Sequence, residues 1–184
     1  MKLASWNVNS LKIRLPQLLE WLAASQPDVV CLQETKLEDH NFPREEIEAA
    51  GYEAAFFGQK TYNGVALLSR HGLNAITLGN PHFEDEQKRL IAATVGTTRV
   101  ICAYMPNGQA PGSDKFAYKM RWLQALRAWL QQELQKTPRL LLMGDFNITF
   151  DDDDVWDPEG LRETIHCTTE EREQLQALVQ LGLA

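Results

Sequence analysis

The chain has 184 residues, 44% of them hydrophobic and 23% charged, with a formal net charge of -7 and a pI near 5.1. This length allows one domain with a sizeable core, so we expect a single domain over residues 1–184. The apolar content is that of a globular protein, and the acidic balance argues against a protein that holds nucleic acid through a broad basic surface.

The first residues, MKLASWNVNS, contain no apolar segment typical of a signal peptide, and no run approaches the length of a membrane span. We therefore expect a cytoplasmic protein with no membrane association and no obligate protein partner. The three cysteines lack zinc-ligand spacing and the four histidines are scattered, so any metal site should use oxygen ligands.

Short apolar strands alternate with amphipathic helices along the first part of the chain. Leucines at helical spacing predict a helix at 10–25, with Pro16 in its first turn or at a kink. Apolar runs bounded by turn residues predict strands, at residues 2–8, 28–35, 64–70, 90–95 and 98–108.

The second part begins with a long predicted helix at 113–137, for which Ser113 is the expected N-cap. A strand at 139–148 follows. A last helix opens at Thr168, with Glu171 three residues later completing a capping box. Strands in succession, interrupted by long helices, predict a layered α/β or α+β fold.

Three of the predicted strands end in polar groups, namely Asn7, Glu34 and the sequence Gly144-Asp145-Phe146-Asn147. If these strands are neighbours in one sheet, their polar ends converge at one edge. Residues two apart in an extended strand face the same side, so Asp145 and Asn147 are expected to reach one site. Gly144 would let the backbone come close to whatever lies there.

Carboxylate and amide oxygens are the ligands expected for Mg²⁺ or Mn²⁺, which bind through one or two carboxylates together with a substrate phosphate. The pattern therefore points to phosphate-ester chemistry. Asp and Asn are also common turn residues after a strand, so each motif alone is a weak signal. The inference depends on the whole set, in this order: WNVNS, PDVVCLQETK, GVALLSR, AYMPNG and GDFNI.

Taken together, these segments resemble the exonuclease III family of abasic-site endonucleases, within the endonuclease/exonuclease/phosphatase superfamily. The resemblance implies a four-layered α/β sandwich of two packed mixed sheets flanked by helices. It also implies a Mg²⁺-dependent phosphodiesterase of base excision repair, with Mn²⁺ as a possible substitute. The implied substrate is double-stranded DNA with abasic sites or 3′ ends, on which incision 5′ to the lesion, 3′→5′ exonuclease and 3′-phosphatase activities are expected.

The resemblance also implies roles for individual residues. Glu34 is the main metal ligand, with Asn7 beside it, and Asp145 and Asn147 contribute further oxygens. Tyr104 resembles the active-site tyrosine that hydrogen-bonds the scissile phosphate or the attacking oxygen. Asp145 resembles the acid/base carboxylate, and Asn147 the amide that orients that group and stabilises charge on the phosphate.

Four loop residues fall where the family meets the DNA backbone: Tyr62, Asn63, Arg89 and Asn107. A few such contacts would position a duplex without reading its sequence. The acidic run from Asp151 to Asp154 lacks the glycine and the spacing of an EF-hand, so we expect a solvated acidic loop there.

The family pattern continues with strands that carry an Arg-Ile-Asp motif and a terminal Ser-Asp-His motif, which this sequence does not contain. We therefore expect a fold that is incomplete at its C-terminus, lacking its last strands and the Asp-His pair usually assigned as general base and metal ligand. Two other functions stay open: a non-catalytic nucleic-acid-binding member of the fold, and a phosphoesterase acting on phosphoinositides or phospholipids.

Overall fold

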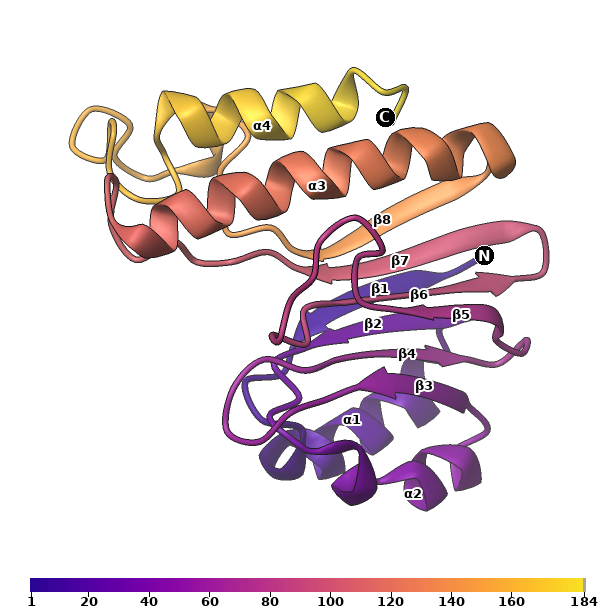
Figure 1. Ribbon diagram of the computed structural model, residues 1–184. Coiled ribbons are helices and arrows are strands. Elements are labelled where there is room, and N and C mark those ends of the chain that lie inside the picture. The colour runs from indigo at the N-terminus through magenta and orange to yellow at the C-terminus, as the bar shows by residue number, and fades with distance from the viewer. Residues whose placement is uncertain (184) are drawn as a thin grey trace. The chain divides into compact units, whose positions relative to one another are not determined.

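The computed structural model describes residues 1–183, which form two four-stranded mixed sheets and four α-helices (Figure 1). In the first half of the chain the elements are β1 (Leu3–Asn7), α1 (Leu11–Ser25), β2 (Val29–Gln33), α2 (Arg44–Ala49), β3 (Glu53–Phe57) and β4 (Val65–Ser69). The second half contributes β5 (Asn74–Leu78), β6 (Leu90–Val95), β7 (Thr98–Tyr104), α3 (Asp114–Lys136), β8 (Leu140–Asp145) and α4 (Thr169–Val179).

The two sheets have matching strand arrangements. The first has the order β1-β2-β4-β3 and the second the order β5-β6-β7-β8. Each has one parallel pair, β1 with β2 and β7 with β8, while its other pairs are antiparallel. A parallel pair needs a long crossover connection, and α1 and α3 are the helices that make it.

Strand β2 lies between two apolar cores, and every one of its residues is buried. Val30 and Leu32 pack in a cluster with leucines of α1 and Ile47 of α2. Val29 and Cys31 point the other way, into a cluster shared with strands of the second sheet. One face of the first sheet therefore packs against the second sheet, and its other face is covered by α1 and α2. This arrangement confirms the predicted α/β fold with two packed mixed sheets and flanking helices.

All the predicted strands and long helices are present, and three elements were missed. Strands β3 and β5 and the short helix α2 were not predicted from the sequence. Strand β3 has only five residues and two of them are alanine, while β5 is an edge strand whose residues are mostly exposed. Neither carries the apolar alternation that marked the other strands. Pro16 lies inside α1, beyond its first turn.

Gly144 allows two strands to pack closely. Its φ is +147°, and a Cβ added there would lie 1.8 Å from the carbonyl oxygen of Ala103 on β7. Gly144 and Ala103 are paired in the parallel register of the two strands. The glycine therefore permits close approach between the two strands near the end of β8, and its approach to a ligand stays a prediction.

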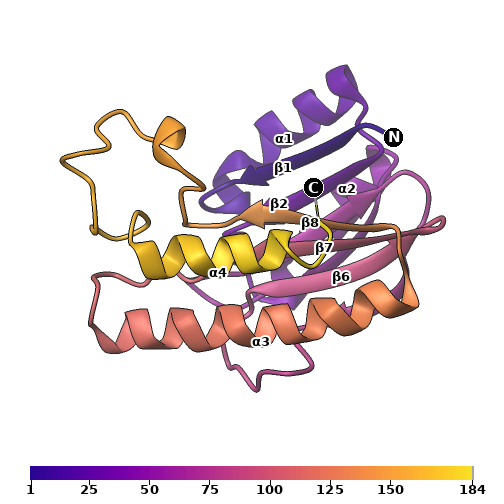
Figure 2. The same cartoon turned by 90° about the horizontal axis from the view of Figure 1, so that it is seen from above.

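The chain divides into two compact units. One comprises Met1–Asn80, Glu84–Tyr104 and Thr137–Asp145, and so contains both sheets with α1 and α2. The other comprises Pro81–Phe83, Met105–Lys136 and the residues from Phe146 onward. Within that second unit α3 and α4 run side by side in both views (Figures 1 and 2). The expectation of a single domain stays a prediction.

The two predicted helix caps are confirmed. The hydroxyl of Ser113 accepts a hydrogen bond from the backbone N–H of Phe116 at 3.1 Å. Thr168 and Glu171 form the reciprocal capping box at the start of α4. Among residues 1–183, no helix has the length and apolar character needed to cross a bilayer.

Candidate active site

Asn7 joins the two carboxylates that the sequence singled out. Its side-chain amide nitrogen donates to Oε1 of Glu34 at 2.8 Å and to Oδ2 of Asp145 at 2.8 Å. Asn7 ends β1 and Glu34 follows β2, and these strands are parallel neighbours. Asp145 ends β8 in the other sheet, so the condition under which convergence was inferred, three neighbouring strands in one sheet, does not hold. The polar ends nevertheless converge, because the two sheets pack face to face.

The backbone around Glu34 is held in a strained conformation. Glu34 has a φ of +54°, in the left-handed region that residues with side chains seldom adopt. Its carbonyl accepts from the N–H of Ser10 at 2.8 Å, and the next N–H, of Thr35, donates to the carbonyl of Gly64 at 3.1 Å. Such strain persists only where surrounding contacts over-determine it, and it often marks a functional site.

Hydrogen bonds favour the ionised form of Glu34. Partial burial alone would raise the pKa of this carboxyl, but hydrogen bonds from Asn7, Lys36 and Tyr104 outweigh burial, so the pKa lies below its usual value. The Nζ of Lys36 lies 3.0 Å from Oε2 of Glu34 and also donates to the side-chain oxygen of Asn9. Glu34 is therefore negatively charged at neutral pH, with one oxygen facing Asn7 and the other facing Lys36.

Tyr104 remains protonated beside these carboxylates. The pKa of Tyr104 is raised to about 12, mainly by burial and also by the nearby charges of Glu34 and Asp145, against the opposing effect of Arg89. The guanidinium of Arg89 lies over the ring of Tyr104, 4.7 Å from its centroid. At neutral pH Tyr104 can therefore donate a hydrogen bond and does not act as a phenolate.

A chain of polar contacts leads from Tyr104 to two of the loops expected to meet DNA. Arg89 donates to the side-chain oxygen of Gln87 at 2.8 Å, and the amide of Asn63 donates to the same oxygen at 3.4 Å. The side chain of Tyr62 is 68% exposed. The structure thus brings Tyr62, Asn63 and Arg89 onto adjoining loops that connect to the candidate site.

The oxygen groups of this cluster fit a hard divalent cation. The carboxylates of Glu34 and Asp145 both accept a hydrogen bond from the amide of Asn7, and both residues are partly exposed. Mg²⁺ and similar ions bind to such a pair of carboxylates together with water and phosphate. Among residues 1–183 no three His, Cys, Asp or Glu side chains are grouped closely enough to hold a metal ion by themselves. Asn7 turns its nitrogen to the carboxylates, while its oxygen accepts from the N–H of Asn9 at 3.0 Å. In this arrangement Asn7 positions the carboxylates.

Asn147 and Asn107 belong to the second unit. Strand β8 ends at Asp145 and Asn147 has a φ of +49°, so the expectation that an extended strand would carry both residues is wrong. The amide nitrogen of Asn147 donates to the carbonyl of Met105 at 3.0 Å. The amide nitrogen of Asn107 lies 2.9 Å from Nε2 of His166. The segments after β7 and β8 therefore meet through Asn147 and Met105.

Three polar residues near the predicted site residues were not assigned from the sequence: Lys36, Gln87 and Lys119. Lys36 is part of the motif LQETK, but no role was predicted for it. Lys119 carried a clearer signal, because it lies on the apolar stripe of α3, three residues after Phe116 and directly before Met120. A charged residue at a buried helical position requires a partner, and that rule could have identified it. Gln87 gave no signal in the sequence.

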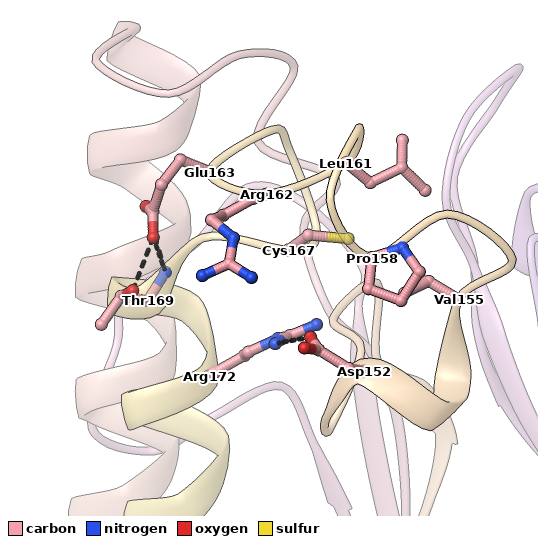
Figure 3. Close-up of a pocket in the computed structure, with 9 residues that line it drawn as sticks. All are labelled: Asp152, Val155, Pro158, Leu161, Arg162, Glu163, Cys167, Thr169 and Arg172. Carbon is pink, nitrogen blue, oxygen red and sulfur yellow. Dashed lines mark hydrogen bonds and ion pairs between the residues drawn. The ribbon is translucent and has the colours of Figure 1, made fainter.

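The acidic run is exposed, as predicted, and makes a short turn (Asp152–Asp154). It adjoins a pocket of about 110 Å³ in the second unit, which is lined by Asp152, Val155, Pro158, Leu161, Arg162, Glu163, Cys167, Thr169 and Arg172 (Figure 3). Arg172 pairs with Asp152 at 2.7 Å, and Glu163 accepts from the hydroxyl of Thr169 at 2.6 Å. None of the predicted site residues lines this pocket.

Comparison with known proteins identifies relatives over nearly the whole chain. Residues 4–177 match the model of the Endonuclease/Exonuclease/phosphatase family. An exodeoxyribonuclease III of Haemophilus influenzae is 37% identical over 195 residues, covering 100% of this chain and 73% of that protein. A Neisseria 3′ phosphatase solved with a product DNA hairpin has a TM-score of 0.97 at 44% identity, covering 98% of this chain and 71% of that one. An AP endonuclease from Archaeoglobus fulgidus has a TM-score of 0.94 at 32% identity, covering 98% and 70%.

Proposed function

This chain belongs to the Endonuclease/Exonuclease/phosphatase family and, within it, to the exonuclease III group of abasic-site endonucleases, and we propose that it is a metal-dependent DNA repair nuclease. The proposed substrates are duplex DNA with an abasic site and duplex DNA with a blocked or ordinary 3′ end. Relatives named as exodeoxyribonuclease III, 3′ phosphatase and AP endonuclease support this range of substrates.

One observation carries the proposal more than any other: two carboxylates from different sheets share the amide of Asn7 beside a protonated tyrosine. A phosphodiester is an anion that repels hydroxide, so its hydrolysis needs charge neutralisation, an oriented water and stabilisation of the leaving oxygen. A site with two carboxylates and a phenol can meet these needs once a cation is present.

We assign the metal to Glu34, with Asn7 and Asp145 completing its surroundings and Mg²⁺ as the preferred ion, for which Mn²⁺ can substitute. Such an ion, when bound, neutralises charge on the phosphate and polarises it toward attack. Glu34 would hold the ion beside the ammonium of Lys36 or in place of it. The residues fit the ion through hard oxygen chemistry rather than through a closed ligand cage.

The chain's own residues carry out the other tasks. Asp145 either takes the proton of the attacking water or gives a proton to the leaving 3′ oxygen. The hydroxyl of Tyr104 donates to a phosphate oxygen, which its high pKa makes possible at neutral pH. Asn147 stabilises charge on the phosphate through its amide nitrogen. Arg89, Tyr62, Asn63 and Asn107 hold the DNA backbone in register.

The test uses duplexes that carry either one abasic analogue or one 3′-phosphate, with Mg²⁺, Mn²⁺ or EDTA. The parent chain is compared with Asp145→Asn and with Glu159→Gln, a change to an exposed loop carboxylate. We expect cleavage that EDTA abolishes, that Asp145→Asn lowers by about 100-fold or more, and that Glu159→Gln leaves unchanged.

Three results would contradict the proposal. Cleavage that persists in EDTA would exclude a metal-dependent site, and cleavage that survives Asp145→Asn would exclude the assigned carboxylate. DNA binding without turnover, unchanged by EDTA, would support a non-catalytic nucleic-acid-binding protein. A parallel assay with phosphoinositides tests the remaining alternative, which no feature of the site favours.

A further inference from the structure

Lys119 is a fully buried lysine in α3 that the proposed chemistry does not use, and its side chain is 0% exposed. Its ammonium group has three donors and the second unit provides an acceptor for each. These are a carboxylate oxygen of Glu171, the backbone carbonyl of Asn147 at 2.6 Å and the backbone carbonyl of Asn107 at 3.2 Å. The charge is thus desolvated and fully hydrogen-bonded.

Glu171, the counter-ion, is held as firmly as the lysine. Its side chain is also 0% exposed. One of its oxygens accepts from Lys119, and the other accepts from the backbone N–H of Thr168 at 3.2 Å and from the hydroxyl of Thr168 at 2.8 Å. The start of α4 therefore fixes the carboxylate, and the carboxylate fixes the ammonium.

The burial of this pair is not explained by stability alone. Two charges lose their hydration when they are buried, and a well-packed apolar pair of similar volume usually gives equal or greater stability. What an apolar pair could not do is hold two backbone carbonyls. Both of these carbonyls belong to residues with assigned roles: Asn147 in stabilising the phosphate and Asn107 in contacting DNA.

Asn147 also needs such support from its surroundings. Its backbone lies in the left-handed region with a φ of +49°, and its side-chain amide donates to the carbonyl of Met105. A residue in this conformation relaxes unless neighbouring contacts prevent it. The ammonium of Lys119 binds the carbonyl of that same residue, so it fixes the peptide plane from which the amide side chain projects.

We propose that Lys119, held by Glu171, is a positioning residue that sets the segments carrying Asn147 and Asn107 for catalysis. It acts through these residues and makes no contact with substrate itself. This inference rests on the proposed function, since it assumes that Asn147 acts in phosphodiester cleavage. It goes beyond that function because it assigns a catalytic consequence to an ion pair buried between α3 and α4.

The test compares the double variant Lys119→Met/Glu171→Gln with the single variant Leu130→Ala. The double variant removes both charges together, and glutamine keeps the capping interaction with Thr168. Leu130 is a buried residue of α3 that has no hydrogen bond to either loop. It serves as the matched control, since its truncation loosens the same helix without touching the carbonyls.

Three quantities are measured on each folded variant: kcat and KM on the better DNA substrate, and the backbone amide NMR signals of Asn107, Asn147 and Ile148. For the double variant we expect kcat to fall by about 10- to 100-fold, because small displacements of a positioned group cost this much. We expect KM to change by less than about threefold, and the three signals to shift. Leu130→Ala should unfold at a lower temperature and keep the parent kcat.

A folded double variant with parent kcat and unshifted signals would overturn the inference, and so would an equal loss of kcat in Leu130→Ala. If the double variant does not fold, Lys119→Arg takes its place, because it keeps the charge but displaces the donors. A parent chain inactive on every DNA substrate would refute the proposed function instead. In that case the amide signals alone decide whether Lys119 sets the two segments.

Discussion

Two lysine–glutamate pairs, one in each compact unit, show how the surroundings of an ion pair determine what it can do. Lys36 and Glu34 lie 3.0 Å apart, with side chains 27% and 20% exposed. Lys119 and Glu171 are both 0% exposed. The first pair adjoins a second carboxylate, Asp145, through the amide of Asn7, whereas backbone carbonyls and a helix cap surround the second.

The partly exposed pair can open, because water can solvate the lysine once it leaves the carboxylate. Glu34 is then available to a metal ion. The buried pair cannot open without leaving a charge unsolvated, so it fixes the geometry around it. The partly exposed pair can therefore exchange its partners, whereas the buried pair is fixed. The predictions that follow test this difference.

The largest effect is expected on stability when one partner of each pair is removed. Lys119→Met leaves Glu171 buried and unpaired, which should lower the free energy of unfolding by about 3–5 kcal/mol. Lys36→Met removes the exposed partner of Glu34 and should cost about 0.2–1 kcal/mol. Denaturant unfolding of the two variants measures both values. Equal losses would remove the distinction between the pairs.

The next effect concerns Asn147, whose backbone the buried pair holds. Asn147→Ala removes the amide donor while leaving the carbonyl contact with Lys119 in place, and kcat should fall by about 100- to 1,000-fold. Asn107→Ala should mainly raise KM, by less than about tenfold, because it removes a contact to the DNA backbone. Steady-state kinetics on the same duplex measure kcat and KM of both variants. Similar changes in kcat would show that Asn147 has no special role.

The smallest predicted effect is on the titration of Tyr104, which lies beside the partly exposed pair of Lys36 and Glu34. Because the pKa of Tyr104 is raised to about 12, the folded protein holds this proton at pH values where the unfolded chain releases it. The stability contribution of Tyr104 is therefore complete below about pH 10 and is lost as the pH rises toward 12. The tyrosinate absorbance of the parent minus that of Tyr104→Phe should show this late titration. A midpoint near pH 10 would contradict it.

The contribution of Glu34 to stability depends on pH in the opposite direction. Its folded-state pKa lies below the unfolded value, so its contribution to stability is present above the unfolded pKa and is lost as the pH falls through the folded one. Activity should be lost in the same acidic range, because a protonated Glu34 cannot bind a cation. Protonation of Glu34 is therefore expected to lower both the activity and the stability of that unit in the acidic range.

The fold could be predicted from the sequence where one residue pattern determines one element. Alternating burial in β2, the long apolar stripe of α3 and the Thr168–Glu171 capping box are each encoded locally. The exposed edge strand β5 escaped prediction because an edge strand buries too little apolar surface to leave a clear alternation. The assignment of β8 to a different sheet from β1 and β2 also escaped, since strand neighbours are determined by tertiary packing.

The candidate site, too, has features that the sequence predicts locally and features that depend on tertiary packing. Asn7, Glu34 and Asp145 could be placed together, because each ends a strand or directly follows one. That a single amide would join the two carboxylates could not be foreseen, since it depends on the packing of two sheets. Asn147 was expected in an extended strand and instead adopts a left-handed conformation, which tertiary contacts of Lys119 and Met105 maintain.

The assignment of Glu34 as the residue that holds the metal ion can be tested by Mn²⁺ binding, followed by electron paramagnetic resonance. Parent, Glu34→Gln and the control Glu159→Gln are titrated with Mn²⁺ in the absence of DNA. We expect Glu34→Gln to weaken Mn²⁺ binding by about tenfold or more and Glu159→Gln to match the parent. Equal Mn²⁺ affinity in the parent and in Glu34→Gln would contradict it, because the metal would then be bound elsewhere.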